Sequence, residues 1–232
     1  MPNMDGFQAI QKIRAQDHFK NLPIIAVTAN ALPGDKEAYL AAGMVDEAKS
    51  RLTALIGHLA PYAEQGIAIV GLEPSCLFTL RDEALSMGLG QSAQAVSEHA
   101  QLLEEFLAKE HKANRFIPSF KESAKPILVH GHCHQKAFAA VSPALELLKL
   151  IPNANPQLIE SSCCGMAGSF GYEVEHIEAS KQMAELSLLP TIRKQPNALV
   201  VADGTSCRHQ IADGASREAV HIATVLNGHL DT

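Results

Sequence analysis

The sequence lacks any run of apolar residues long enough to cross a membrane. Such a helix needs about 20 consecutive apolar residues, and charges interrupt residues 1–20, which excludes a signal-peptide core there as well. Positive charge is not in excess either, because 19 Lys and Arg stand against 25 Asp and Glu. These absences argue against nucleic acid as a partner. They favour a cytoplasmic protein, free in solution or peripheral at the inner face of the membrane.

The number of cysteines is odd, so the chain lacks a full set of disulfide partners. Five cysteines cannot all pair in internal disulfides. In a reducing compartment such thiols are more often metal ligands or catalytic groups. Their placement along the chain therefore decides how they are interpreted.

Short apolar runs alternate with helical patterns, and 47% of the residues are hydrophobic, enough for an ordinary core. Apolar runs occur at 67–71, 126–129 and 198–201, with a weaker run at 157–160. Each run leads into small residues and a cysteine. Helices are predicted at 45–58, 92–108, 142–150 and 174–189. This alternation predicts an α/β fold with a mainly parallel sheet, helices on both faces, and cysteines at the carboxyl ends of the strands, where ligands bind.

Four cysteines are the strongest candidates for a metal site: Cys133, Cys163, Cys164 and Cys207. Soft thiolate sulfur stabilises iron, and an iron–sulfur cluster needs several such ligands. The adjacent pair is informative, because neighbouring side chains do not easily chelate one zinc ion but can reach different irons of a cluster. Gly165 and Gly168 follow the pair and let backbone N–H groups approach cluster sulfur.

Four motifs resemble the cysteine-rich CCG domain of iron–sulfur oxidoreductases: GLEPSCLFTLRDE (71–83), HGHCHQKA (130–137), SCCGMAGSFGYE (162–173) and GTSCRHQI (204–211). That family includes the iron–sulfur subunits of glycolate oxidase and anaerobic glycerol-3-phosphate dehydrogenase. The motifs are also similar to the C-terminal part of FAD-linked D-2-hydroxyacid dehydrogenases, of the D-lactate or 2-hydroxyglutarate type.

The resemblance implies an electron-transfer module with an iron–sulfur cluster of the 4Fe–4S type. Electrons would come from a flavin-containing dehydrogenase domain or subunit that oxidises a D-2-hydroxyacid, and would pass to an acceptor such as a quinone. The FAD would lie on a missing domain or on the partner. We therefore do not expect this chain to oxidise substrate alone, and no catalytic residue is assigned.

The family pattern has two repeats, each with a lone Cys, a Cys-Cys-Gly step and a final Cys-x-x-Cys. On that pattern Cys76 is the last cysteine of the first repeat. Gln210 stands where the second repeat would place its last thiol. This departure favours a four-cysteine site, completed by Cys76 or His134, over a five-thiolate cluster. The second repeat then supplies Cys133, Cys163, Cys164 and Cys207.

Residues 1–44 resemble the second half of a response-regulator receiver domain, with Thr28 at the position of its switch threonine. The phosphoacceptor aspartate would precede Met1, so we expect no phosphate-accepting switch. The predicted organisation is a partial receiver-like segment at 1–45, a linker helix at 46–64 and the CCG domain at 65–232. Such a join resembles a fusion.

Other interpretations remain open at this point. Zinc is the main chemical alternative, with ligands drawn from His130, His132, Cys133, His134 and Cys207. A nucleophilic Cys207, beside Arg208 and His209, is another. Cys76 alone can equally be a small buried residue. A phosphorylation-independent signalling or interaction fragment, and a folded remnant without activity, are the alternatives outside metal chemistry.

Overall fold

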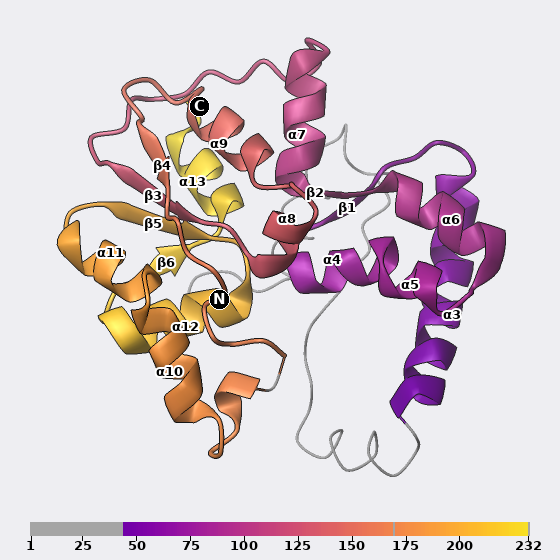
Figure 1. The fold of residues 1–232 in the computed structure, drawn as a ribbon. Coiled ribbons are helices and arrows are strands. Elements are labelled where there is room, and N and C mark those ends of the chain that lie inside the picture. Colours follow the sequence, from indigo (N-terminus) through magenta and orange to yellow (C-terminus); the bar gives the residue numbers. More distant parts are fainter. Residues whose placement is uncertain (1–43, 169, 232) are drawn as a thin grey trace. The chain divides into compact units, whose positions relative to one another are not determined.

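The computed structural model describes residues 44–168 and 170–231, which form helices and parallel strands (Figure 1). The α/β class is thereby confirmed. The chain divides into two compact units, 1–30 and 31–232, and all described residues belong to the second. The receiver-like segment predicted at 1–45 lies outside the described residues, except for its last two positions.

The first part of the described chain, residues 44–112, is called the small-sheet region here. Its two strands pair in parallel, with Ile69 opposite Ala100 and Gly71 opposite Leu102. Helices pack around this sheet and enclose a core that includes Phe78. The elements are α3 (Met44–Ala63), β1 (Ile69–Gly71), α4 (Pro74–Arg81), α5 (Glu83–Ser86), α6 (Gly90–His99), β2 (Ala100–Leu102) and α7 (Leu103–Lys112).

The single helix predicted at 92–108 is wrong, because strand β2 interrupts it. Ala100 and Leu102 are 3% and 0% exposed and pair with β1, so burial within a sheet overrides the helical periodicity of the sequence. The chain turns helical again at Leu103. There the Glu105 carboxylate accepts a hydrogen bond from the backbone N–H of Leu102 at 2.9 Å and caps the new helix.

The second part, residues 126–231, is called the large-sheet region. Its four strands are all parallel and lie in the order β4-β3-β5-β6. The elements are β3 (Ile127–His130), α8 (Cys133–Ala137), α9 (Ser142–Leu148), β4 (Pro156–Leu158), the 3-10 helix η2 (Phe170–Tyr172), α10 (Ile177–Glu185), α11 (Leu188–Lys194), β5 (Leu199–Ala202), α12 (Thr205–Ala215), β6 (Ala219–Val220) and α13 (Ile222–His229).

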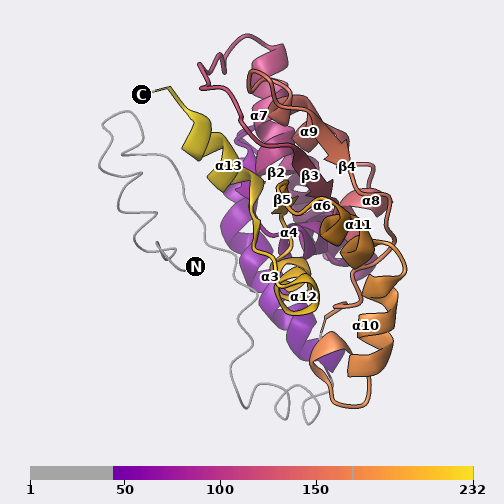
Figure 2. The ribbon, with the colours of Figure 1, turned by 90° about the vertical axis from the view of Figure 1, so that its left-hand side faces the viewer.

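Alternate residues of the central strands face two different apolar clusters. Leu128 and Val200 pack with residues of α11 and α12, whereas Ile127 and Val201 pack with residues of α9 and α13. This alternation is the expected consequence of side chains pointing to opposite faces along a strand. Figures 1 and 2 show α9 and α13 on one side of the sheet and α11 and α12 on the other.

Helix boundaries elsewhere differ from the predicted ones in detail. The predicted helix at 174–189 is two helices, because α10 ends at Glu185 and α11 begins at Leu188. The helix expected at 45–58 extends to Ala63 and contains Pro61. The two-residue strand β6 was not anticipated.

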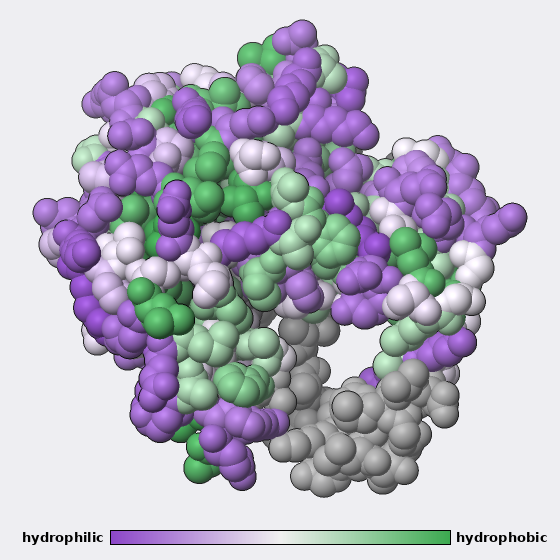
Figure 3. Space-filling view, viewed as in Figure 1, coloured by the Kyte–Doolittle hydropathy of each residue, from purple (hydrophilic) through white to green (hydrophobic). Residues whose placement is uncertain are grey.

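Within the described part of the chain, no helix is both long and apolar enough to span a membrane. Hydrophilic residues cover much of the face seen in Figure 3, and hydrophobic residues are grouped nearer its middle.

Candidate metal centre

The cysteines of the large-sheet region follow three neighbouring strands. Cys133 is the first residue of α8, after β3, and Cys207 lies in the first turn of α12, after β5. The pair Cys163 and Cys164 lies in the loop after β4. Strand β3 pairs with both β4 and β5, so segments that are far apart in the sequence start from adjacent strands.

The four thiols form a continuous chain of contacts. The sulfur atoms of Cys164 and Cys207 lie 3.3 Å apart. Cys163 forms side-chain hydrogen bonds with both Cys133 and Cys164. Cys164 and Cys207 are 4% and 1% exposed, whereas Cys133 and Cys163 are half-buried. The structure therefore brings together the four cysteines that the sequence singled out.

The contacts shift the pKa values of the four thiols in opposite directions. Hydrogen bonds from Cys133 and Cys164 lower the pKa of Cys163. The hydrogen bond from Cys164, and in addition the nearby His130 ring, lower the pKa of Cys207. The pKa values of the two donor thiols are raised by the same hydrogen bonds and by burial. The arrangement holds protons at positions where a cation can replace them, because metal binding requires deprotonated thiolates.

Gly165 supplies backbone geometry that no other residue would adopt easily. Its φ of +91° lies in the left-handed region, and its N–H donates to the sulfur of Cys163 at 3.3 Å. A Cβ at this position would collide with the backbone carbonyl of Ser180. Gly168 has a φ of +54°, but a Cβ there would meet open space. Of the two predicted glycines, the structure places only Gly165 against a cysteine sulfur.

Gly204 was not identified from the sequence, although it is packed directly against the thiols. A Cβ at Gly204 would lie 2.5 Å from the His132 ring and 3.2 Å from the Cys207 sulfur. The position of Gly204 immediately before α12, in the Gly-Thr-Ser-Cys run, was the available signal. A side chain there would push the imidazole and the thiol apart.

Gln210 stands where the expected Cys-x-x-Cys pattern would place a second thiol, and its side chain links neighbouring backbone segments. Its amide nitrogen donates to the backbone oxygen of Cys164 at 2.9 Å and to the backbone oxygen of Ser180 at 3.0 Å. A third contact joins it to the Ser180 hydroxyl at 3.1 Å. Gln210 therefore fixes the backbone of the cysteine pair against α10 and α12.

His130 lies at the end of β3 and is 2% exposed. Its Nδ1 is 3.0 Å from the hydroxyl of Ser161, and its Nε2 has no hydrogen-bond partner among the described residues. One ligand atom each from His130, Cys164 and Cys207 lies within 4.8 Å of the others. These three residues form a group that can hold a metal ion. In the sequence His130 was only one of several candidate zinc ligands.

Lys136 places a positive charge beside the thiols. Its ammonium donates to the backbone oxygens of Ser161 and Ser162, at 2.5 and 2.8 Å, and so fixes the loop that leads into the cysteine pair. Burial lowers the pKa of Lys136, and the neighbouring cysteines oppose that shift. No sequence pattern indicated this role, because it depends on the fold of the loop after β4.

Cys76 is not part of this chain of thiols. It lies in α4 of the small-sheet region and forms no hydrogen bond with another cysteine in the range 48–168 or 170–231. Burial, and then the nearby Glu73, raise the pKa of its thiol. The Glu73 carboxylate instead accepts hydrogen bonds from the N–H and hydroxyl of Thr205, at 2.9 and 2.8 Å.

The residues that suggested a nucleophilic Cys207 have other partners. Arg208 donates to the backbone oxygens of Ala202 and Asp203. His209 Nδ1 is hydrogen-bonded to the Tyr172 hydroxyl at 2.8 Å. Of the residues near Cys207, His130 at the end of β3 is therefore the better candidate for a base that activates the thiol.

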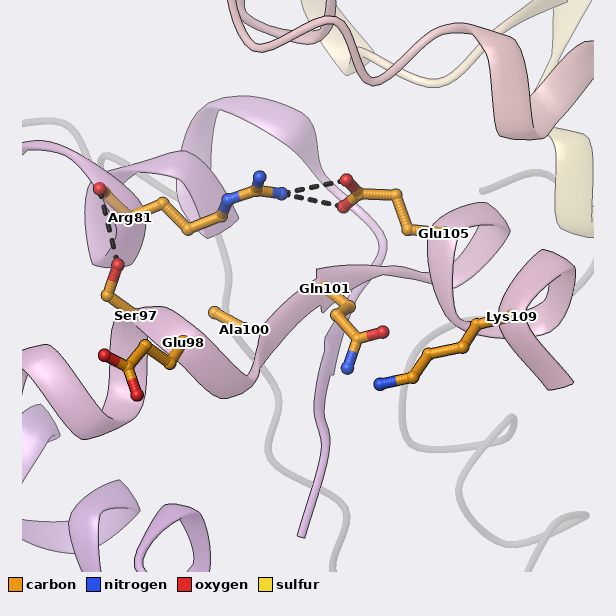
Figure 4. Close-up of a pocket in the computed structure, with 7 residues that line it drawn as sticks. All are labelled: Arg81, Ser97, Glu98, Ala100, Gln101, Glu105 and Lys109. Carbon is orange, nitrogen blue, oxygen red and sulfur yellow. Dashed lines mark hydrogen bonds and ion pairs between the residues drawn. The ribbon is translucent and has the colours of Figure 1, made fainter. Parts of the chain in front are cut away.

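A pocket in the small-sheet region has different chemistry (Figure 4). Arg81 and Glu105 point toward one another across it and form an ion pair at 2.8 Å. Its lining residues include neither cysteine nor histidine, so it offers no soft metal ligands: Arg81, Ser97, Glu98, Ala100, Gln101, Glu105 and Lys109.

No protein-family model matches the chain. It is 27% identical over 188 residues to a subunit of the anaerobic glycerol-3-phosphate dehydrogenase of Escherichia coli K12, covering 81% of this chain and 47% of that protein. It is 29% identical over 150 residues to D-2-hydroxyglutarate dehydrogenase of Pantoea ananatis, covering 64% of this chain and 14% of that protein. A stretch of 46 residues, 20% of the chain, is 50% identical to 5% of the signal transduction histidine-protein kinase BarA of Escherichia coli K12.

The chain thus spans about half the length of the first relative and a much smaller share of the second. Both relatives are dehydrogenases or dehydrogenase subunits by name. The comparisons therefore show homology to parts of two dehydrogenases.

Proposed function

We propose that this chain is the iron–sulfur electron-transfer module of a flavin-linked dehydrogenase, with the cluster held by Cys133, Cys163, Cys164 and Cys207 at the carboxyl ends of three neighbouring strands. The observation that carries the proposal is the contact chain of four thiols. Homology to parts of two dehydrogenases supports the redox role.

The donor set fits an iron–sulfur centre by its chemistry. Four soft sulfur atoms lie together, and the buried imidazole nitrogen of His130 faces the same site without a protein partner among the described residues. When bound, a cluster of the 4Fe–4S type supplies one-electron transfer. Around it, the Gly165 N–H donates to sulfur, and the Lys136 ammonium offsets negative charge. Burial of Cys164 and Cys207 excludes water from the inner side of the site.

The substrate and the partners follow from the relatives' names and from the motif resemblance. We propose a flavin-containing dehydrogenase domain or subunit as the electron donor, acting on a D-2-hydroxyacid of the D-lactate, glycolate or 2-hydroxyglutarate type. An acceptor such as a quinone would take the electrons, at the inner face of the membrane. Glycerol 3-phosphate is the competing substrate, because one relative is named for it.

The domain organisation remains a proposal of the same kind. We propose a CCG domain over residues 65–232 and a receiver-derived segment over residues 1–45, on the motif resemblances of the sequence. The helix between them, α3, packs its Leu59 into the core of the small-sheet region together with Phe78 and Val96. This packing supports a proposal in which α3 belongs with the folded part that follows it.

The test is purification under strictly anaerobic conditions, with iron and labile-sulfide analysis and EPR of the reduced protein. We expect iron and sulfide together, and an EPR signal that appears on reduction. Stoichiometric zinc without sulfide would overturn the proposal and would favour a structural zinc site at His130, Cys164 and Cys207. Absence of bound metal after reconstitution with iron and sulfide would also overturn it.

A further inference from the structure

The imidazole of His130 presents one nitrogen into the thiol site without a partner. The side chain is 2% exposed, so water does not satisfy Nε2. Among the described residues no group meets hydrogen-bond geometry with Nε2, although the Cys207 thiol lies close to the ring and interacts with it. A buried polar nitrogen left unpaired is unfavourable. One ring nitrogen of His130 lies within 4.8 Å of the sulfur atoms of Cys164 and Cys207, and a metal ion bound there would give the unpaired nitrogen a partner.

The other ring nitrogen is held in the way that ligand histidines require. Nδ1 of His130 lies 3.0 Å from the Ser161 hydroxyl oxygen. The ammonium of Lys136 donates to the same oxygen at 3.3 Å, which favours Ser161 as an acceptor. Nδ1 then carries the hydrogen, and Nε2 keeps its lone pair. Metal-bound histidines usually donate their second ring N–H to such an outer partner, which fixes both tautomer and orientation.

From these observations we infer that His130 is a nitrogen ligand of the metal centre, bound through Nε2 beside Cys164 and Cys207. This inference rests on the proposed function for the identity of the metal. It replaces His134 and Cys76 as the residue that completes the four-cysteine set.

Neither of the two residues suggested by the sequence is placed as well. Cys76 lies outside the chain of thiols, in the small-sheet region. His134 also has a buried nitrogen without a partner among the described residues, but its ring packs edge-on against Phe78 at 6.1 Å. Among the described residues, the ligand atoms that lie within 4.8 Å of one another belong to His130, Cys164 and Cys207. His134 lies outside this group, as do Cys133 and Cys163.

Ligation by His130 explains how the site can do without the thiol that Gln210 replaces. Four cysteines and His130 give five donors, the number that the family pattern would reach with five thiolates. Exchanging an anionic thiolate for a neutral imidazole leaves less negative charge on the centre. A higher reduction potential is expected in consequence, as for other iron–sulfur centres that exchange cysteine for histidine.

The experiment uses the full chain labelled with ¹⁵N-histidine, loaded with iron and sulfide and reduced, and measured by pulsed EPR. A strong hyperfine coupling to one histidine nitrogen is expected. His130→Gln, which keeps a neutral side chain of similar volume, should abolish the coupling. His134→Ala is the matched control and should keep the coupling.

The outcomes separate this inference from the proposed function. A cluster with only weak nitrogen coupling would make His130 a hydrogen-bond donor to sulfur, which overturns the inference and leaves the proposed function standing. Loss of the coupling in His134→Ala, with retention in His130→Gln, would overturn it in favour of His134.

A second measurement decides the inference if no cluster assembles, a result that would overturn the proposed function. The metal-free chain is titrated with Co²⁺ alone, and proton NMR is recorded in H₂O and in D₂O. One strongly shifted, exchangeable imidazole N–H signal, absent from His130→Gln, supports ligation by His130. A Co²⁺-bound protein without such a signal overturns it.

Discussion

The small-sheet and large-sheet regions carry the same local pattern but make different environments for their cysteines. Cys76 follows β1 through a short loop into a helix, as Cys133 follows β3 and Cys207 follows β5. Strand β1 pairs only with β2 among the described strands, whereas β3 lies between β4 and β5. A strand–loop–helix motif therefore brings a thiol to a site only when neighbouring strands of the same sheet carry further ligands.

The largest difference between the two regions should appear when one cysteine of each is replaced. Cys164→Ser removes a buried sulfur that contacts Cys163 and Cys207, and we expect bound iron to fall by roughly tenfold or more. Cys76→Ser should leave iron unchanged, because no hydrogen bond joins Cys76 to those thiols. Iron and sulfide analysis of the two variants, purified in parallel, measures both. Equal losses would mean that Cys76 belongs to the site.

The next prediction concerns the hydrogen bonds of Gln210 that hold the backbone of the cysteine pair. Gln210→Ala removes a buried amide that donates to the backbone oxygens of Cys164 and Ser180. Leaving buried acceptors without a donor should lower the free energy of unfolding by about 2 kcal/mol. Urea denaturation of the metal-free protein measures this, so that metal affinity does not contribute. Gln182→Ala, at an exposed position in α10, is the control and should change little.

A metal-free Gln210→Ala protein as stable as the parent would show that the amide hydrogen bonds are replaced by others. In that case the departure from the Cys-x-x-Cys pattern would have no structural role. The contacts among the thiols would then be the remaining difference between the cysteine environments of the two regions.

The sequence predicted the central strands of the large-sheet region well, but it missed a strand in each region and joined separate helices. Strands β3 and β5 lie within a residue of their predicted runs, because fully buried parallel strands read as continuous apolar stretches. Strand β2 was missed, since Ala100, Gln101 and Leu102 also fit the periodicity of the helix around them. Only pairing with β1 makes them extended, and pairing is not visible in a single local window.

The candidate site shows the same limit. The four cysteines could be named from the sequence because thiols are rare and the Cys163–Cys164 pair is distinctive. His130 and Lys136 could not be singled out, since their roles depend on which strand lies next to which. The hydrogen bonds formed by Gln210 were hidden for a further reason: a residue that departs from a family's ligand pattern gives no sign of what it binds instead.

Two buried acids, Glu104 and Asp203, should make the free energy of unfolding depend on pH. Burial, and then the nearby Asp203, raise the pKa of Glu104 to about 8 from an ordinary value of 4.5. Below about pH 4.5 the carboxyl is protonated in both states, so its contribution to stability is fully present. As the pH rises toward 8, the unfolded chain gives up the proton first and stability falls.

Glu104→Gln should remove this dependence, which approaches about 1.4 kcal/mol per pH unit for one proton. The Gln135 amide, which donates to Glu104 at 2.6 Å and to Asp203 at 3.1 Å, keeps an acceptor in the variant. Urea unfolding across this pH window, compared with the exposed control Glu178→Gln, checks the slope. A variant that loses stability with pH as steeply as the parent would assign the effect to other groups.

The smallest predicted effect concerns the ion pair between Arg81 and Glu105, which stabilises the small-sheet region. Arg81 and Glu105 are both half-buried, and a double-mutant cycle with alanine at each position should give a coupling of about 1 kcal/mol. The cycle is needed because Glu105 also caps α7 and Arg81 also lies 4.9 Å from the Phe78 ring, so each single change removes a second contact. Bound iron should stay constant in Arg81→Ala, since the ion pair contacts no thiol. A loss of iron there would mean that the two regions form one cooperative site, with the small sheet stabilising the thiols at a distance.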